Sequence, residues 1–175
     1  MKKLMLFALL ATGLSLTVNA QQKPPLSPAA AATGKIGDAN ITINYSSPSV
    51  RGRQIWNTDL VPYGKVWRAG ANKATIFETD KDIMVEGQKL PAGKYSVYAI
   101  AGESDWVIIF NSQTGQWGIT SAHETTLDPA KDVIRVHVKP VKVPDMQEAM
   151  SYNVNSNGVD LRWEYLKVPI SIKNY

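Results

Sequence analysis

Residues 46–75 contain the densest group of side chains that could bind a ligand. The segment reads SSPSVRGRQIWNTDLVPYGKVWRAGANKAT and mixes arginines, aromatic residues and amides. Aromatic faces offer apolar area, while guanidinium and amide groups supply fixed hydrogen bonds, a mixture typical of polar-rimmed pockets. Arginine can also grip a carboxylate through two parallel hydrogen bonds. The candidate ligand-binding residues are Arg51, Arg53, Tyr63, Trp67, Arg68 and Asn72, together with Trp117 further along the chain.

The same segment also has an architectural interpretation. Trp67 and Trp117 could fill the core, as we expect Trp106 and Trp163 to do. Arg68 could equally be a buried arginine that satisfies loop carbonyls, which would make the whole segment a structural plug. A loop this long in a compact domain is usually either functional or packed by its own side chains. The sequence leaves both interpretations open.

Catalytic patterns are weak by comparison. The chain has two histidines, and His137 falls on the polar side of a predicted strand over 133–138, where we expect it to be solvated. His123 is followed by Glu124, but the chain has no HExxH or similar ligand spacing, no Gly-x-Ser-x-Gly motif and no glycine-rich phosphate loop. We therefore predict no catalytic residue, no metal and no cofactor. A hydrolase that uses two distant carboxylates, or His123 with a carboxylate, remains the alternative.

The first residues predict an export signal. Lys2 and Lys3 precede an apolar stretch over residues 4–18, and small residues follow at the cleavage position before Gln21. The apolar stretch of 15 residues is short against the roughly 20 that a spanning helix needs. We predict a signal peptide at 1–20 and a periplasmic or secreted mature chain that is soluble and has no membrane span.

Composition limits the partners of the mature chain. The sequence has 19 Lys and Arg against 15 Asp and Glu, and removal of Lys2 and Lys3 leaves 17 against 15, a net charge of +2. Such a balance gives no electrostatic footprint for nucleic acid. The chain has no cysteine, which excludes disulfides and thiolate chemistry. The oligomeric state is not predicted.

The pattern after the signal favours a single β domain. Residues 21–34 are rich in Pro, Ala and Gln and predict a disordered spacer, so the domain is expected over 35–175. Alternating or continuous apolar residues then predict strands, separated by turn residues and without a convincing helical period. These strands lie near 41–45, 74–79, 82–86, 89–90, 94–100, 106–110, 133–138, 159–165 and 168–172. We predict an all-β fold, a β-sandwich or jelly-roll-like barrel of about eight to ten strands.

Two details near the C-terminus bear on this fold. The apolar alternation changes parity around Lys167, which predicts a bulge or bend there. Pro169 suggests that the last strand lies at a sheet edge, so a free edge at 170–172 could pair with a partner strand.

The chain resembles the bacterial domain-of-unknown-function family 2911 over nearly the whole mature length. In the segment above, the matching positions are Ser47-Pro48, Arg51-Gly52-Arg53, Leu60 to Gly64, Val66 to Arg68, Gly70 to Asn72 and Ala74-Thr75. Further matches are Leu90, Ala92-Gly93, Tyr95, Trp106, Ile109, Asn111, Trp117-Gly118 and Leu161-Arg162-Trp163-Glu164. Asn57 and Ala69 depart from the family pattern, which more often has glycine and threonine there. The resemblance implies a secreted β domain of the bacterial envelope and no particular activity.

Our leading hypothesis is a non-enzymatic envelope module that binds a small polar ligand, such as a glycan or a peptide, through this Arg/Asn/aromatic loop. The alternatives are a hydrolase acting on envelope or imported polymers and a purely structural or assembly module.

Overall fold

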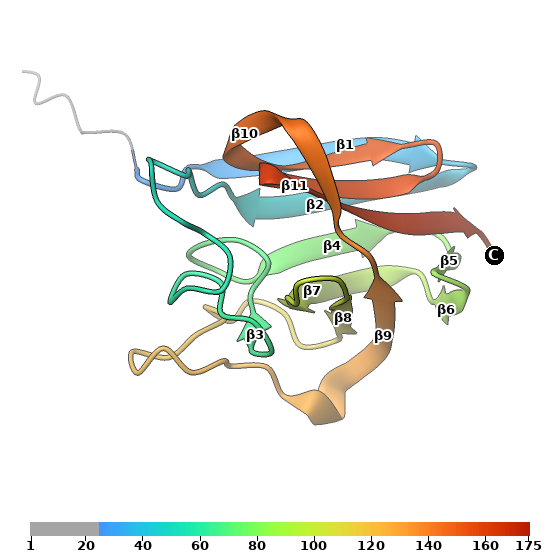
Figure 1. Ribbon diagram of the computed structural model, residues 1–175. Coiled ribbons are helices and arrows are strands. Elements are labelled where there is room, and N and C mark those ends of the chain that lie inside the picture. The colour runs from blue at the N-terminus through green and yellow to red at the C-terminus, as the bar shows by residue number, and fades with distance from the viewer. Residues whose placement is uncertain (1–24) are drawn as a thin grey trace, which may run out of the picture.

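The computed structural model describes residues 25–175 as two antiparallel β-sheets (Figure 1). The predicted signal peptide at 1–20 lies outside the described residues. Within 25–175 there are eleven strands and one 3-10 turn, Pro129–Lys131, and no helix there is long and apolar enough to cross a membrane. The predicted all-β sandwich is therefore confirmed. The sheets stay open, so the jelly-roll-like barrel is not the architecture.

The larger sheet has seven strands and contributes most of the core. Its main path is β1-β2-β4-β7-β8-β9, and the short β3 pairs with β7 beside that path. The alternation of apolar and polar residues fixes which way each strand faces. In β2, Ile41 and Ile43 point inward while Asn40 and Asn44 face water, and a shift of one residue in the register would reverse this. The strands are β1 (Ala29–Ile36), β2 (Ala39–Ser46), β3 (Val66–Trp67), β4 (Thr75–Thr79), β7 (Gly93–Ile100), β8 (Trp106–Asn111) and β9 (Asp132–Val138).

The smaller sheet follows the order β10-β11-β5-β6. It consists of β5 (Ile83–Val85), β6 (Gln88–Leu90), β10 (Val141–Asn155) and β11 (Gly158–Asn174). The β5–β6 hairpin turns at Glu86-Gly87, so the turn begins one residue earlier than the gap between the strands predicted near 82–86 and 89–90, and both turn residues have positive φ, 46° and 81°. Two successive positive φ angles give the turn whose twist matches the flanking strands.

The last strand, β11, doubles back on itself. Glu164 has a φ of 53°, and from this residue the chain reverses, so the backbone N–H of Ile172 reaches the carbonyl oxygen of Asn157 at 3.0 Å. The predicted bend near Lys167 therefore occurs three residues earlier. In consequence Tyr165, which alternation places on the apolar face, is exposed.

The structure corrects the predicted edge at 170–172. Ile170 and Ile172 are buried, and Ile172 pairs with Val85 of β5. The backbone of this segment is therefore already paired within the sheet, which removes the predicted docking edge for a partner strand.

The start of the domain is also corrected. Strand β1 begins at Ala29, inside the predicted disordered spacer of 21–34, and pairs with β2 from Ala29 opposite Ser46 to Ile36 opposite Ala39. Backbone hydrogen bonds need no particular side chain, so an alanine-rich stretch can complete the edge of a sheet. The predicted boundary at residue 35 thus falls within a strand.

Four tryptophans form the centre of the core next to the long loop over 47–65. The ring of Trp56 meets Trp106 at 5.3 Å and Trp163 at 5.7 Å between centroids, both edge to face, while Trp67 stacks on Trp163 at 6.1 Å. Edge-to-face and offset stacks are the favourable arrangements of aromatic rings. The expected core positions of Trp106 and Trp163 are confirmed, and the cluster gives the loop a rigid base.

Candidate functional site

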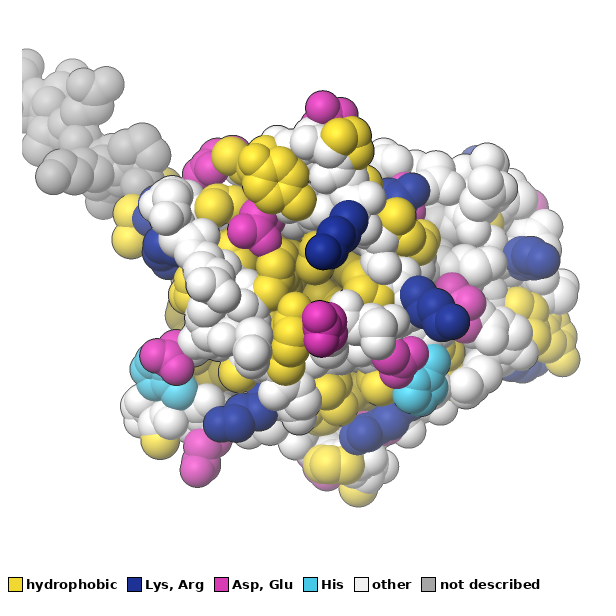
Figure 2. All heavy atoms as spheres, viewed as in Figure 1, with side chains coloured by type: hydrophobic (Ala, Val, Ile, Leu, Met, Phe, Trp, Pro, Cys, Tyr) yellow, Lys and Arg dark blue, Asp and Glu magenta, His cyan; other side chains and the backbone are white. Residues whose placement is uncertain are grey.

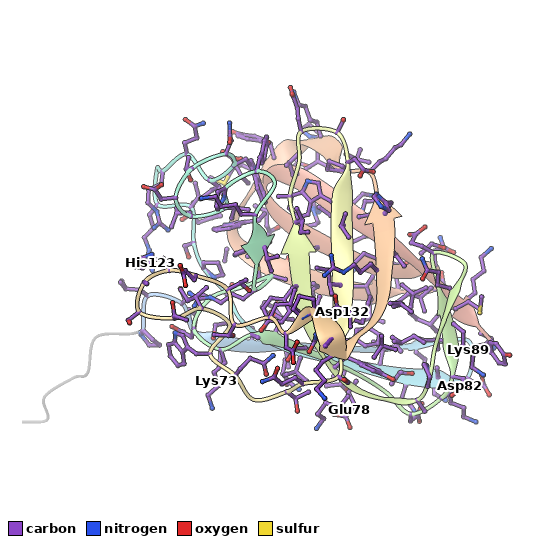
Figure 3. The ribbon with its side chains drawn as sticks, turned by 90° about the horizontal axis from the view of Figure 1, so that it is seen from below. Lys73, Glu78, Asp82, Lys89, His123 and Asp132 are labelled. Carbon is purple, nitrogen blue, oxygen red and sulfur yellow. The ribbon has the colours of Figure 1, made fainter. Side chains whose placement is uncertain are left out.

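A pocket of about 860 Å³ opens beside the tryptophan cluster. Its walls come from the first described residues, from the loop region between β2 and β4, and from the loop that contains His123, at one end of the molecule in Figure 3. Five of the seven candidate residues line this pocket: Arg51, Arg53, Trp67, Arg68 and Asn72. Trp67 and Trp163 are the buried aromatic residues of the lining, and we take them as its floor.

The other two candidates lie elsewhere. Tyr63 is half-buried against the main core, and burial, with smaller effects of Glu103 and Glu164, raises the pKa of its phenol. Trp117 is 53 % exposed and does not line the pocket. Its side chain fills neither the pocket nor the core, which departs from both interpretations of the sequence.

Three of the polar candidates use their side chains to hold the walls of the pocket. Arg51 Nη2 donates to the carbonyl of Leu26, and Asn72 Nδ2 donates to the carbonyl of Ser27 at 3.1 Å. Both contacts fasten the first described residues to the loop. Arg53 closes its own turn, because its Nε and Nη2 donate to the carbonyls of Val50 and Ser49 at 3.1 and 2.6 Å.

Arg68 differs from these side chains. Its Nη1 is buried and has no hydrogen-bond partner among the described residues. Burial lowers the pKa of its guanidinium, an effect that Tyr98 partly offsets. The stem of Arg68 passes over Gly118, where a Cβ atom would lie 2.7 Å from the Arg68 Cβ. An unpaired buried donor costs about 1–3 kcal/mol, more when charged, so an anion that reached this nitrogen would be bound favourably.

The backbone around Arg68 is fixed by hydroxyl groups from two strands, β4 and β10. Ala69 has a φ of 51°, which is unfavourable for alanine. Its carbonyl oxygen accepts hydrogen bonds from Thr75 Oγ1 at 2.8 Å and from the Tyr152 hydroxyl at 2.9 Å. Burial raises the pKa of Tyr152, so this hydroxyl stays protonated and donates. The indole of Trp67 donates to the carbonyl of Gly70 at 3.2 Å and fixes the other side of Ala69.

Sequence reasoning did not identify Thr75 or Tyr152 as site residues. Each is a buried hydroxyl on the inward face of a strand. A buried hydroxyl needs a hydrogen-bond partner, so the burial of Thr75 and Tyr152 is a sign that each has one. The sequence does not indicate that both share the carbonyl of Ala69.

Charged side chains around the pocket are mostly cationic. Besides the three arginines, Lys65 lines it, against the carboxylates of Asp59 and Glu124, and the imidazole of His123 is also in the lining. None of these residues takes part in an ion pair found within residues 25–175. On the face shown in Figure 2, cationic and anionic side chains are interspersed. Lys65 and Asp59 were not among the predicted site residues.

A second groove of about 560 Å³ lies between β9 and β11. It contains a contact of 2.8 Å between His137 Nδ1 and Asp105 Oδ2, and both side chains are largely exposed. The exposure of His137 agrees with the expected solvated position. This groove is not lined by any of the buried side-chain atoms that lack a partner. We therefore take the pocket at Arg68 as the candidate site.

The candidate site does not assemble a catalytic pair. His123 and Glu124 are exposed on the pocket rim, and within the described chain no hydrogen bond joins the His123 ring to a carboxylate. Among residues 25–175 no group of three His, Asp or Glu residues is arranged to hold a metal ion.

Removal of the Tyr152 hydroxyl tests how Arg68 is positioned. Tyr152→Phe should lower the free energy of unfolding by about 1 kcal/mol, because the Ala69 carbonyl loses one donor. The folded-state pKa of Tyr152 lies above its ordinary value of about 10. The contribution of its hydroxyl to the free energy of unfolding is therefore present below about pH 10 and is lost as the pH rises further. Urea unfolding at neutral and at alkaline pH should show that the free energy of unfolding falls less steeply with rising pH in Tyr152→Phe than in the wild type. If the free energy of unfolding falls equally steeply in both proteins, the Tyr152 hydroxyl does not have the role that we assign to it.

Comparison with known proteins agrees with this structure. No curated protein and no solved structure shows significant similarity to the chain. A family model described as a protein of unknown function, DUF2911, matches residues 27–172, which include both sheets except the last two residues of β11, and every residue of the candidate site named above except Leu26. The match begins two residues before β1, in accord with the corrected start of the domain. The chain therefore belongs to the DUF2911 family.

Proposed function

We propose that this protein is an exported, non-enzymatic module that binds a small polar ligand with a carboxylate group in the pocket at Arg68. Lys2, Lys3 and the apolar stretch over 4–18 support the export of the chain. The ligand's carboxylate would accept hydrogen bonds from the Arg68 guanidinium. The pocket volume falls within the range of about 300–1,000 Å³ that is usual for small-molecule sites.

The observation that carries this proposal is the buried Nη1 of Arg68, which has no partner among the described residues. Guanidinium groups match carboxylates in planar geometry, and burial strengthens the attraction because solvent screening is reduced. The fixed carbonyl of Ala69 holds the backbone that carries Arg68. A side chain so positioned loses little freedom on binding, which favours affinity.

A hydrolase is the alternative, and it would rely on His123 with Glu124 or Asp59 in the same pocket. These groups share a cleft, as that alternative requires. Their rings and carboxylates are not joined by hydrogen bonds in the described chain, whereas general acid–base catalysis needs such positioning. Binding through Arg68 is the function that the contacts favour.

Thermal unfolding with a panel of ligands tests the proposal. Acidic glycans, cell-wall fragments and short peptides are added to the purified protein. A ligand that binds only the folded state raises the melting temperature, because at a hundred times its dissociation constant it adds about 2.7 kcal/mol to the free energy of unfolding. Arg68→Lys keeps the charge but loses the planar fork, so binding of the active ligand should weaken about tenfold.

Lys73→Met is the matched control, because Lys73 is exposed and lies outside the pocket lining (Figure 3). It removes a neighbouring positive charge and should leave the affinity unchanged. If no carboxylate in the panel stabilises the protein, or if Arg68→Lys binds as tightly as the wild type, the proposal fails. A ligand that is turned over, with turnover lost in Glu124→Gln, would instead favour the hydrolase.

A further inference from the structure

From the lining of the same pocket we infer that its ligand joins the carboxylate to an apolar body, as in an acyl-chain acid or the C-terminal residue of a peptide with an apolar side chain. This inference rests on the proposed function. It goes further because it specifies what lies beyond the carboxylate, and it disfavours a glycan.

Large apolar side chains reach solvent at the rim of the pocket. Leu26 is 72 % exposed and Leu60 is 40 % exposed, and both line the pocket. Exposed apolar area of this kind, set beside a cavity, is typical of a surface that a ligand covers. The ring of Trp67 and the ring of Trp163 continue the apolar surface inward to the floor.

Three of the polar side chains that line the pocket are already engaged within the chain. Arg51, Arg53 and Asn72 already donate to backbone carbonyls of the pocket walls. Arg68 and Trp163 are the lining residues with a buried side-chain nitrogen that lacks a partner in the described chain, and Arg68 is the charged one of the two. A sugar would bring many hydroxyls to this surface, and unpaired buried hydroxyls are costly. An apolar body would bring none, and one carboxylate would pair with Arg68.

The arrangement therefore separates two kinds of contact. Arg68, whose Nη1 is buried, lines the same pocket as Leu26 and Leu60, whose side chains are exposed. A ligand whose carboxylate enters first would leave its apolar body against the two leucines. Lys65, also in the lining, would add to the attraction for an anion without specifying its shape.

A chain-length series tests this inference. The purified protein is titrated with acetate, hexanoate and decanoate, with decanol, with glucuronate, and with N-acetyl-leucine, and binding is followed by calorimetry and tryptophan fluorescence. Affinity should rise from acetate to decanoate, by at most about fourfold for each buried methylene. Decanol and glucuronate should each bind at least about tenfold more weakly than decanoate. Tighter binding of N-acetyl-leucine than of hexanoate indicates a peptide source, and the reverse indicates an acyl chain.

Leu60→Ser identifies the apolar contact, with Met146→Ser as its control. Met146 is 47 % exposed and lies outside the pocket, so both changes remove a comparable exposed apolar side chain. Leu60→Ser should weaken decanoate several-fold and leave acetate unchanged, while Met146→Ser should change neither. Equal affinity along the series, with dependence on Arg68 retained, would overturn this inference alone. Absence of binding by every carboxylate tested, glucuronate included, would overturn the proposed function as well.

Discussion

Trp106→Ala is expected to lower the free energy of unfolding by about 3–5 kcal/mol, the cost of emptying a large buried aromatic site. Trp106 is 0 % exposed, and its indole N–H donates to the carbonyl of Gly102 at 2.9 Å. Its ring also packs edge to face against Trp56 and Trp67. The surrounding rings are rigid and held by both sheets, so they cannot collapse into the space. Urea unfolding measures this loss directly if the dependence of the free energy on urea concentration is the same in the variant and the wild type.

Trp117→Ala is the matched control for this prediction. The same residue type is removed, but from a site that is 53 % exposed and outside both core clusters. Its effect on the free energy of unfolding should stay within about 0.5 kcal/mol. If both substitutions cost the same, the tryptophan cluster is not the centre of the core.

Strands with one apolar and one polar face were predicted from the sequence. In β2 the alternation of Ile41 and Ile43 with asparagines fixes both the strand and the face that it buries. The first half of β11 follows the same rule through Leu161 and Trp163. A one-residue slip would expose every apolar side chain of such a strand, so the sequence pattern is a strong constraint.

Elements without that pattern were missed or misplaced. Strand β1 is rich in alanine, which carries no periodic signal, and its pairing with β2 comes from backbone hydrogen bonds. The reversal of β11 occurs at Glu164, a residue type that rarely takes positive φ, so its sequence gave no warning. The fold forces this conformation because both limbs of β11 bury apolar side chains.

For the site, the sequence identified the segment but not the role of each side chain. Arg51, Arg53 and Arg68 look alike in sequence, yet two of them hold carbonyls and only Arg68 has a buried nitrogen without a partner in the described chain. That division depends on tertiary contacts. The hydroxyl of Tyr152 that fixes the neighbouring Ala69 comes from 83 residues further along the chain. No local pattern could have predicted this pairing.

Gly118→Ala is expected to weaken binding of the carboxylate ligand by about thirtyfold or more, the effect of losing a buried charged contact. A Cβ atom at this position would lie 2.7 Å from the Cβ and 2.9 Å from the Cδ of Arg68. The arginine stem must move to avoid this overlap, and its guanidinium then leaves the pocket. Calorimetric titration with the ligand identified for the wild type measures the loss.

Gly115→Ala separates this displacement from backbone strain. Both glycines belong to the loop between β8 and β9 and have similar positive φ angles, 90° for Gly115 and 93° for Gly118. Alanine is strained by about 1–2 kcal/mol in such a conformation, so both variants should lose at least this much stability, and Gly118→Ala more because of the overlap with Arg68. A Cβ atom at Gly115 meets nothing within 4 Å. Only the Gly118 variant should therefore lose affinity. If the two variants bind equally well, Arg68 can shift without cost, and its guanidinium is not the group that holds the ligand.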